Sequence, residues 1–248
     1  MEKTAKTSVI LNDNKLPAHL MRKEGAPIRG VENVTQDDLI IPRLEVVQAL
    51  SPCRKKQDPA YIEGIEEGML YNSITREVYG SKVLIVPVSF KKEFLLWKDR
   101  KQGGGFKGVF DSREDAEKFL AGAEDANAIE IVDTAQHFCL LIRADGTTEE
   151  IALSLAKSKM KMSRTLNSLI RISGLDSFAK NYVVSAVLAT NANNEDYWTL
   201  GVAPGTFVSA ETYQKAEQLY NMIQSGNVQM STDFEKEINS DATPGSEY

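Results

Sequence analysis

Apolar and polar residues alternate with a two-residue period over much of the middle of the chain, as expected for β-strands with one buried face. The longest alternating run is KVLIVPVSFKKEFLLWK, residues 82–98. Residues 69–80 predict two short strands around a polar turn, and residues 182–189 and 197–203 predict a hairpin. Residues 128–156 supply two or three more strands, which turn at Asp145-Gly146. Pro87 cannot donate to a strand ladder, so we expect a bulge or a sheet edge at that point.

Helical spacing of apolar residues occurs in four segments. Pro42, near the start of an apolar run, predicts a short helix over residues 42–49. Ser112 and Ser209 are suited to be the N-caps of two further helices. A fourth helix is expected over residues 157–172, ending at Gly174, because glycine readily adopts the left-handed conformation that ends helices.

Hairpin-connected strands with interspersed helices predict an α+β or mainly β fold, with an antiparallel barrel and inserted helices. The alternating order of strands and helices that a parallel sheet requires is missing. We expect a flexible N-terminal arm over residues 1–36, a single domain over 37–226, and an acidic disordered tail over 227–248.

The composition argues against several kinds of site. No run of about 18 apolar residues and no apolar leader occurs, so we expect no membrane span and no export from the cytoplasm where the chain is made. Cys53 and Cys139 are expected to be free thiols of a reducing compartment. His19 and His137 have no partners at the spacing of a zinc site or a catalytic triad, so we predict no metal, no cofactor and no catalytic residue.

The net charge of −6 is concentrated at one end of the chain. Residues 209–248 hold two lysines and seven Asp or Glu, which leaves the rest of the chain nearly neutral. Within that rest lie two basic stretches. A negative total charge therefore does not exclude a nucleic-acid partner, because phosphates respond to local Lys and Arg.

The first basic stretch, residues 90–107, interleaves cations with aromatic rings. Its predicted phosphate-binding residues are Lys91, Lys92, Lys98, Arg100, Lys101 and Lys107, and its predicted base-stacking residues are Trp97 and Phe106. Proteins that bind single strands combine a basic track with aromatic faces on which bases stack. The alternative is a solvated hairpin whose aromatic residues, Phe90 and Phe94 above all, belong to the core.

Gly103, Gly105 and Gly108 in the same stretch match the G-x-G-x-x-G spacing of dinucleotide-binding loops. In such loops the strand runs straight into the glycines, and a helix begins among them. Here four charged residues separate the predicted strand from the glycines, and the next helix is expected only near residue 112. A flexible basic connection between strands is the better interpretation.

The second basic stretch has no acidic residue between Glu150 and Asp176. Its predicted phosphate-binding residues are Lys157, Lys159, Lys161 and Arg164. An ordinary amphipathic surface helix would show the same pattern. The acidic tail, with Asp241, Glu247 and the terminal Tyr248, is predicted either to cover a basic groove or to bind partner proteins, unless it is an ordinary disordered terminus.

Several segments together resemble the single-stranded DNA-binding proteins of tailed bacteriophages. They are DDLIIPRL at 37–44, GMLYN at 68–72, LIVPVSF leading to Trp97, GGGF at 103–106, and the acidic tail with its aromatic end. The resemblance implies an OB-type barrel, binding of single-stranded DNA in phage replication or recombination, and a tail that recruits replication proteins. The last residues, Pro-Gly-Ser-Glu-Tyr, are less acidic than is typical of such tails.

The leading hypothesis is a non-enzymatic protein that binds single-stranded DNA with little sequence preference. We expect it to act in the host cytoplasm. The sequence leaves open whether the protein forms homo-oligomers. One alternative is a phage protein-interaction module that binds a host polymerase or nuclease, and another is a strand-annealing recombinase. Hydrolytic chemistry is the weakest hypothesis. The paired acids Asp37-Asp38 and Glu66-Glu67 have no neighbour that would make them metal ligands or a general acid and base.

Overall fold

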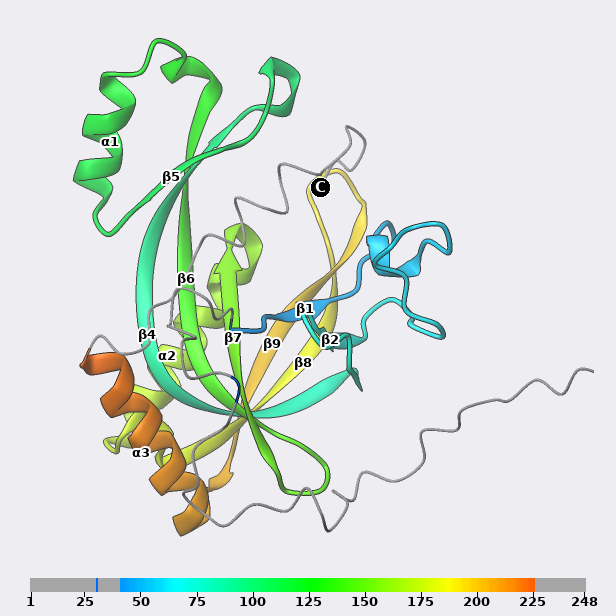
Figure 1. Ribbon diagram of the computed structural model, residues 1–248, viewed down its shortest axis with the longest axis vertical. Coiled ribbons are helices and arrows are strands. Elements are labelled where there is room, and N and C mark those ends of the chain that lie inside the picture. Colours follow the sequence, from blue (N-terminus) through cyan, green and yellow to red (C-terminus); the bar gives the residue numbers. More distant parts are fainter. Residues whose placement is uncertain (1–29, 31–40, 226–248) are drawn as a thin grey trace, which may run out of the picture. The chain divides into compact units, whose positions relative to one another are not determined.

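The computed structural model describes residue 30 and residues 41–225, apart from the side chain of Arg100. All the described helices and strands lie in the unit Gln36–Tyr248. They form a mixed α/β fold of mostly antiparallel strands (Figure 1). The predicted tail over 227–248 lies outside the described residues, as does the predicted arm over 1–36 except for Gly30.

Six strands make the larger sheet, in the order β7-β6-β4-β8-β9 with β5 also beside β4. They are β4 (Lys82–Lys98), β5 (Phe106–Phe110), β6 (Ile129–Ile142), β7 (Thr148–Ala156), β8 (Lys180–Thr190) and β9 (Asp196–Phe207). A smaller sheet contains β1 (Leu44–Val46), β2 (Leu70–Asn72) and β3 (Val78–Gly80). The helices are α1 (Arg113–Ala121), α2 (Met160–Ser173) and α3 (Ala210–Gln224).

The strand pattern of the sequence is confirmed. The run 82–98 forms β4 over its whole length, and its register with β6 shifts between Pro87 and Ser89, where the proline predicted a bulge. The Asp145-Gly146 turn joins β6 to β7, and Asp145 Oδ1 accepts a hydrogen bond of 2.9 Å from the Thr147 N–H. Cys53 and Cys139 are buried and unbridged.

The prediction of a helix over residues 42–49 is wrong, because this segment contains strand β1. Leu44 and Val46 are buried on one side, and β1 pairs with β2. Next to it, the Ala152 N–H of β7 donates to the Pro42 carbonyl at 2.8 Å. Long-range pairing and a period of two therefore override the apolar spacing that suggested a helix.

The other three predicted helices form, with one shifted start. Ser112 and Ser209 cap α1 and α3, and each hydroxyl accepts a backbone N–H at 3.1 Å. Helix α2 begins at Met160, because Lys157 has a positive φ of 49° and residues Lys157–Lys159 form a 3₁₀ turn. Gly174, with φ of 65°, ends α2 as predicted.

The two sheets share one hydrophobic core, but few strand pairings join them. Among the described residues, one isolated bridge pairs Arg43 with Ala152 of β7. The Gln48 side chain also donates to the Trp198 carbonyl at 2.7 Å and accepts from the Trp198 N–H at 2.9 Å. The pairings of the described strands thus do not close into a ring. The antiparallel mixed fold is confirmed, and a closed barrel is not.

The larger sheet is covered on both faces. On one face, Ile85 and Leu141 pack with α2 and with residues of β1 and β2. On the opposite face, Val86 and Leu140 pack against α3. Strands β4 and β6 continue past the rest of the sheet to β5 and α1, where Phe94 and Leu96 form a third cluster with α1 (Figure 1).

Candidate nucleic-acid interface

Strand β4 divides the first basic stretch between two faces, because successive side chains of a strand point to opposite sides. We call the face on which both α1 and α2 pack the α1/α2 face. It carries Phe90, Lys92, Phe94, Leu96 and Lys98 of β4, and Ile129, Ile131, Asp133, Ala135 and His137 of β6. Lys91 and Trp97 lie on the opposite face. The predicted track of cations is thus not continuous in space.

Most of the predicted cations in this stretch form ion pairs within the protein. Lys91 Nζ lies 3.0 Å from Glu93 and 2.8 Å from Asp111, and these pairs raise the pKa of Lys91 although burial opposes them. Lys98 Nζ lies 2.6 Å from Asp125, and its hydrogen bond lowers the pKa of that carboxyl. The lysines in such pairs are less available to phosphates than the sequence suggests.

One more of the predicted cations shares one of these carboxylates. Lys107 Nζ lies 3.9 Å from the Asp125 carboxylate that Lys98 also contacts. Lys101 differs, because no carboxylate of the described residues lies within ion-pairing distance of its ammonium. Arg100 belongs to the 3₁₀ turn Arg100–Gln102, and its side chain lies outside the described part of the structure.

Trp97 and Phe106, the predicted stacking pair, contact each other. They are register partners on β4 and β5, and their ring centroids lie 5.2 Å apart at an interplanar angle of 62°. Both residues are half-buried. Each ring therefore covers part of the other, which reduces the aromatic face that a base could use.

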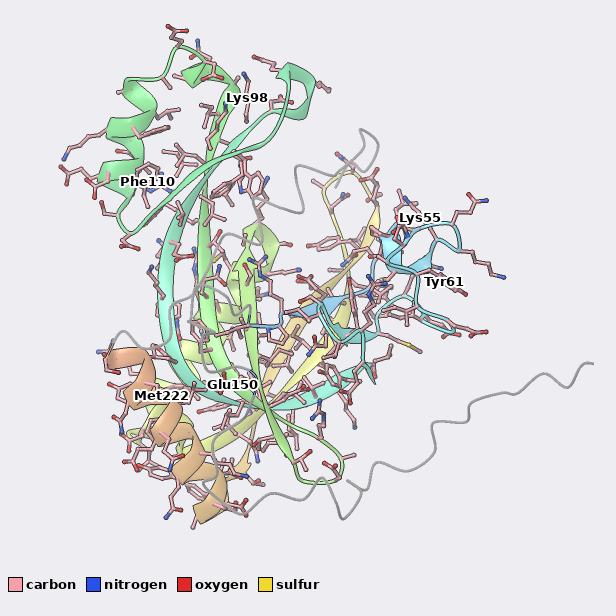
Figure 2. All side chains as sticks on the ribbon, in the orientation of Figure 1. Lys55, Tyr61, Lys98, Phe110, Glu150 and Met222 are labelled. Carbon is pink, nitrogen blue, oxygen red and sulfur yellow. The ribbon has the colours of Figure 1, made fainter. Side chains whose placement is uncertain are left out.

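The glycine-rich loop joins two strands, as expected, and no helix begins in it. Asp99 organises it: its carboxylate accepts the Lys101 N–H at 2.8 Å, and its carbonyl accepts the Gly104 N–H at 3.0 Å. Gly103 and Gly105 have φ angles of 99° and 109°, a region that favours glycine. Figure 2 shows Lys98 at the entry to this loop and Phe110 beside α1. The loop lacks the helix N-terminus that a dinucleotide pyrophosphate requires.

A hollow of about 340 Å³ lies where the second basic stretch leaves the edge of the larger sheet. Strand β7 ends at Ala156, opposite Thr134, so β6 has no described strand partner on that edge over residues 129–133. The hollow is lined by Glu130, Ile131, Val132, Asp133, Lys157, Ser158, Met160, Lys161 and Arg164. We call it the basic hollow.

The cations of the basic hollow differ in their partners. Lys157 Nζ lies 3.1 Å from Glu130, and both side chains are largely exposed. In the described part of the chain, Lys161 and Arg164 have no carboxylate within ion-pairing distance, and neither does Lys159, which lies outside the lining. Exposed, unpaired Lys and Arg side chains bind phosphate without first losing an internal partner.

Arg113 pairs with Asp133 of the basic hollow's lining, and Phe90 lies two residues from Lys92, which pairs with the same carboxylate. Sequence analysis placed neither Phe90 nor Arg113 in the site. Phe90 is 47% exposed, so the interpretation that it belongs to the core is wrong for Phe90, whereas Phe94 is buried as that interpretation expected. Lys92 and Arg113 both pair with Asp133, and they lie over the Phe94 ring at 4.9 and 5.5 Å.

Only one signal in the sequence pointed to these residues. The bulge predicted at Pro87 changes which face the following residues occupy, which is how Phe90 comes to share a face with Ile85 and the residues that pack against α2. Arg113 belongs to a different element, α1, and no sequence pattern links it to β6.

His137 supports this region from beneath. It is buried, its Nε2 lies 2.8 Å from Ser163 Oγ of α2, and its ring lies 4.9 Å from the Phe90 ring. Burial lowers the pKa of His137 to about 4, so the imidazole is neutral near pH 7.

The remaining expectations concern metals, membranes and the tail. No group of three or more His, Cys, Asp or Glu in the described residues is arranged to hold a metal ion. None of the helices described is long and apolar enough to cross a membrane. The predicted partner-binding residues Asp241, Glu247 and Tyr248 lie outside the described residues.

Comparison with known proteins gives one match. A family model described as Pam3 phage gp34-like protein matches residues 6–229. No curated protein and no solved structure matches the chain. The phage origin that the resemblance implied is confirmed, and binding of single-stranded DNA stays a prediction. Because the match spans most of its length, the chain belongs to the Pam3 phage gp34-like protein family.

Proposed function

We propose that this phage protein binds single-stranded DNA with little sequence preference, along the α1/α2 face and through the basic hollow. One observation carries the proposal: cations of α2 that have no carboxylate partner among the described residues line a hollow at the edge of β6, and the neighbouring strand β4 carries an exposed aromatic ring, Phe90. The two basic stretches are far apart in sequence. The Lys157–Glu130 pair supports their convergence, because Glu130 is the register partner of Trp97 on β4.

The charges of this region favour an anionic polymer. Five cations, Lys92, Arg113, Lys157, Lys161 and Arg164, lie with three carboxylates, Glu117, Glu130 and Asp133. Lys and Arg that neutralise phosphates release condensed counterions, and this contribution does not depend on sequence. The local excess of positive charge therefore supports binding although the whole chain is acidic.

The predicted roles in phage biology belong to the same proposal. The protein would act in replication or recombination of phage DNA, on an OB-like scaffold, with the tail residues Asp241, Glu247 and Tyr248 recruiting replication proteins. Lys101, at the tip of the β4–β5 loop, would extend the path of the strand. Lys91, Lys98 and Lys107 would contribute less, because carboxylates already neutralise them.

A salt-dependent titration tests the proposal. Fluorescence anisotropy of a labelled oligothymidylate of about 30 nucleotides, longer than typical site sizes, should show binding that weakens steadily between about 50 and 200 mM salt. Replacing Lys161 and Arg164 together with Ala should weaken binding. The slope of log K against log salt should become shallower by about 1.4, which is about 0.7 for each lost phosphate contact.

Lys55→Ala with Lys56→Ala is the matched control, because it removes the same charge from two exposed lysines that form no ion pair with any described residue. Lys55 lies well away from α2 (Figures 1 and 2). Absence of binding at low salt would overturn the proposal, and a stable protein partner captured after nuclease treatment would then favour an interaction module. Equal losses in the two double variants would show that only total charge matters, which would contradict a site at the basic hollow.

A further inference from the structure

We infer that Phe90 is the residue on which a base stacks, and that it gives this protein its preference for single strands over duplexes. The inference rests on the proposed function and assigns the stacking role to a residue outside the predicted pair Trp97 and Phe106. It follows from where the bulge in β4 places the Phe90 ring and from what surrounds that ring.

The position of Phe90 in the fold explains its exposure. After the bulge between Pro87 and Ser89, Phe90 pairs with His137 and points to the α1/α2 face. Along β4, Ile85 belongs to the cluster that packs against α2, and Phe94 and Leu96 belong to the cluster that packs against α1. Phe90 lies between the two covered regions, and its side chain stays 47% exposed in a strand whose other aromatic residues are buried or half-buried.

A stacking residue should hold its ring in place before the base arrives, because an ordered platform loses less entropy on binding. Phe90 meets this condition through His137, whose ring lies 4.9 Å away at an interplanar angle of 52°. His137 is itself fixed, since it is buried and its Nε2 lies 2.8 Å from Ser163 Oγ of α2. The ring is therefore supported from the core side and open on the solvent side.

Cations lie close enough to serve the same nucleotide. Lys92 follows Phe90 by two residues on the same face, a separation of about 6.6 Å from the rise of a strand. Lys92 and Arg113 share the carboxylate of Asp133, and Arg113 also lies 3.7 Å from the Glu117 carboxylate of α1. A base on Phe90 and its phosphate near Lys92 and Arg113 is the arrangement that single-strand binders use.

The pair Trp97 and Phe106 lacks these properties. Each ring packs against the other at 5.2 Å, and Trp97 lies on the face opposite Lys92. A base could stack there only by separating the two rings. Phe90 needs no such rearrangement.

Stacking on a single aromatic ring discriminates between strand types, because the bases of a duplex are already stacked on each other. Alanine substitution at such a ring costs about 1–3 kcal/mol per base, which corresponds to about 5- to 150-fold in affinity. Duplex binding would depend on the cations alone and would lose nothing when the ring is removed.

The experiment compares Phe90→Ala with Phe207→Ala on a single strand and on a duplex of the same sequence, at one salt concentration. Phe207 is a suitable control, because it is also an exposed strand phenylalanine, 67% accessible, with Lys180 Nζ 4.8 Å from its ring centroid. Phe90→Ala should weaken single-strand binding about 5- to 150-fold and duplex binding less than twofold. Phe207→Ala should change neither.

A second variant, Phe90→Trp, separates stacking from a structural role. It should retain single-strand affinity and add a tryptophan signal that the strand quenches, beyond any change from Trp97 and Trp198. Wild-type affinity of Phe90→Ala for single strands would overturn the inference, and so would an equal loss on duplex. The proposed function would survive either result if Lys161→Ala with Arg164→Ala still weakened binding. If the wild-type protein bound no strand at low salt, the proposed function itself would fail.

Discussion

His137 shows how burial sets the chemistry of a single residue. The sequence offered no metal or triad partner for it, and its polar contact in the described structure is Ser163 of α2 at 2.8 Å. Burial beneath α2 lowers its pKa to about 4, whereas an exposed histidine titrates near 6.5. The charges of Lys91 and Lys98 are instead neutralised by carboxylates: Asp111 and Asp125 reach them from other segments, and Glu93 of the same strand also pairs with Lys91.

Acid should destabilise the protein through His137. Because its folded-state pKa is lowered, the unfolded state binds more protons between about pH 6.5 and pH 4. The stability that the neutral imidazole contributes is complete above about pH 6.5 and is lost as the pH falls towards 4. The fall in the pKa of His137 from 6.5 to about 4 corresponds to about 3 kcal/mol in the free energy of unfolding.

Urea unfolding at pH 7 and at pH 4.5 measures this dependence. Carboxylates also titrate in this range, so the useful quantity is the difference between the wild type and His137→Gln, which cannot protonate. The wild type should lose more of its unfolding free energy than the variant on acidification. Parallel losses in both proteins would show that His137 is not held neutral by the fold.

At the scale of elements, local signals predicted most helices and strands. Ser112 and Ser209 cap their helices, Gly174 ends α2, and residues 82–98 form one long strand. The helix prediction for residues 42–49 was wrong because β1 is defined by its pairing with β2, which lies more than twenty residues later in the chain. The β4–β5 loop is also more ordered than a flexible finger, since Asp99 and the glycines fix its turns.

Replacing both Gly103 and Gly105 with Ala should destabilise this loop without affecting the basic hollow. A Cβ at either position would meet no atom within 4 Å, so the loss of stability would come from backbone strain alone, about 1–3 kcal/mol at each site. Hydrogen exchange should become faster at the Lys98 N–H, which donates to the Gly105 carbonyl at 2.9 Å.

Oligonucleotide affinity of this glycine variant should change less than twofold, because β5 pairs with the edge of β4 that faces away from β6 and the hollow. A loss as large as that of Lys161→Ala with Arg164→Ala would place the main site on the loop instead. Unchanged exchange at Lys98 would contradict the role given to the glycines.

At the scale of the whole fold, the small sheet is held to the large one by contacts that connect distant segments. Gln48 makes two hydrogen bonds with the Trp198 backbone, and Gly68 lies against the Trp198 ring. A Cβ on Gly68 would come within 2.8–2.9 Å of that ring, and its φ is 76°. The position thus requires glycine both for its backbone and for its closeness to Trp198.

Gly68→Ala should lower the melting temperature more than Gly64→Ala does. Gly64 has nearly the same φ, 75°, but a Cβ there meets nothing within 4 Å, so it isolates the backbone cost from the clash. Overpacking adds about 1–3 kcal/mol, and each kcal/mol corresponds to about 2–4 °C for a domain of this size. Circular dichroism melts measure the difference. Equal melting temperatures for the two variants would show that Trp198 yields without cost.

Features that depend on neighbours along the chain could be predicted from the sequence: the alternating apolar and polar residues of the strands, the caps and ends of helices, the bulge at Pro87, and the two basic stretches. Tertiary structure alone decided which charges stay unpaired, because Asp111, Asp125, Asp133 and Glu130 reach the lysines from other segments. It also decided that Phe90 is exposed, since a strand pattern shows which residues share a face but not where two helices leave that face uncovered.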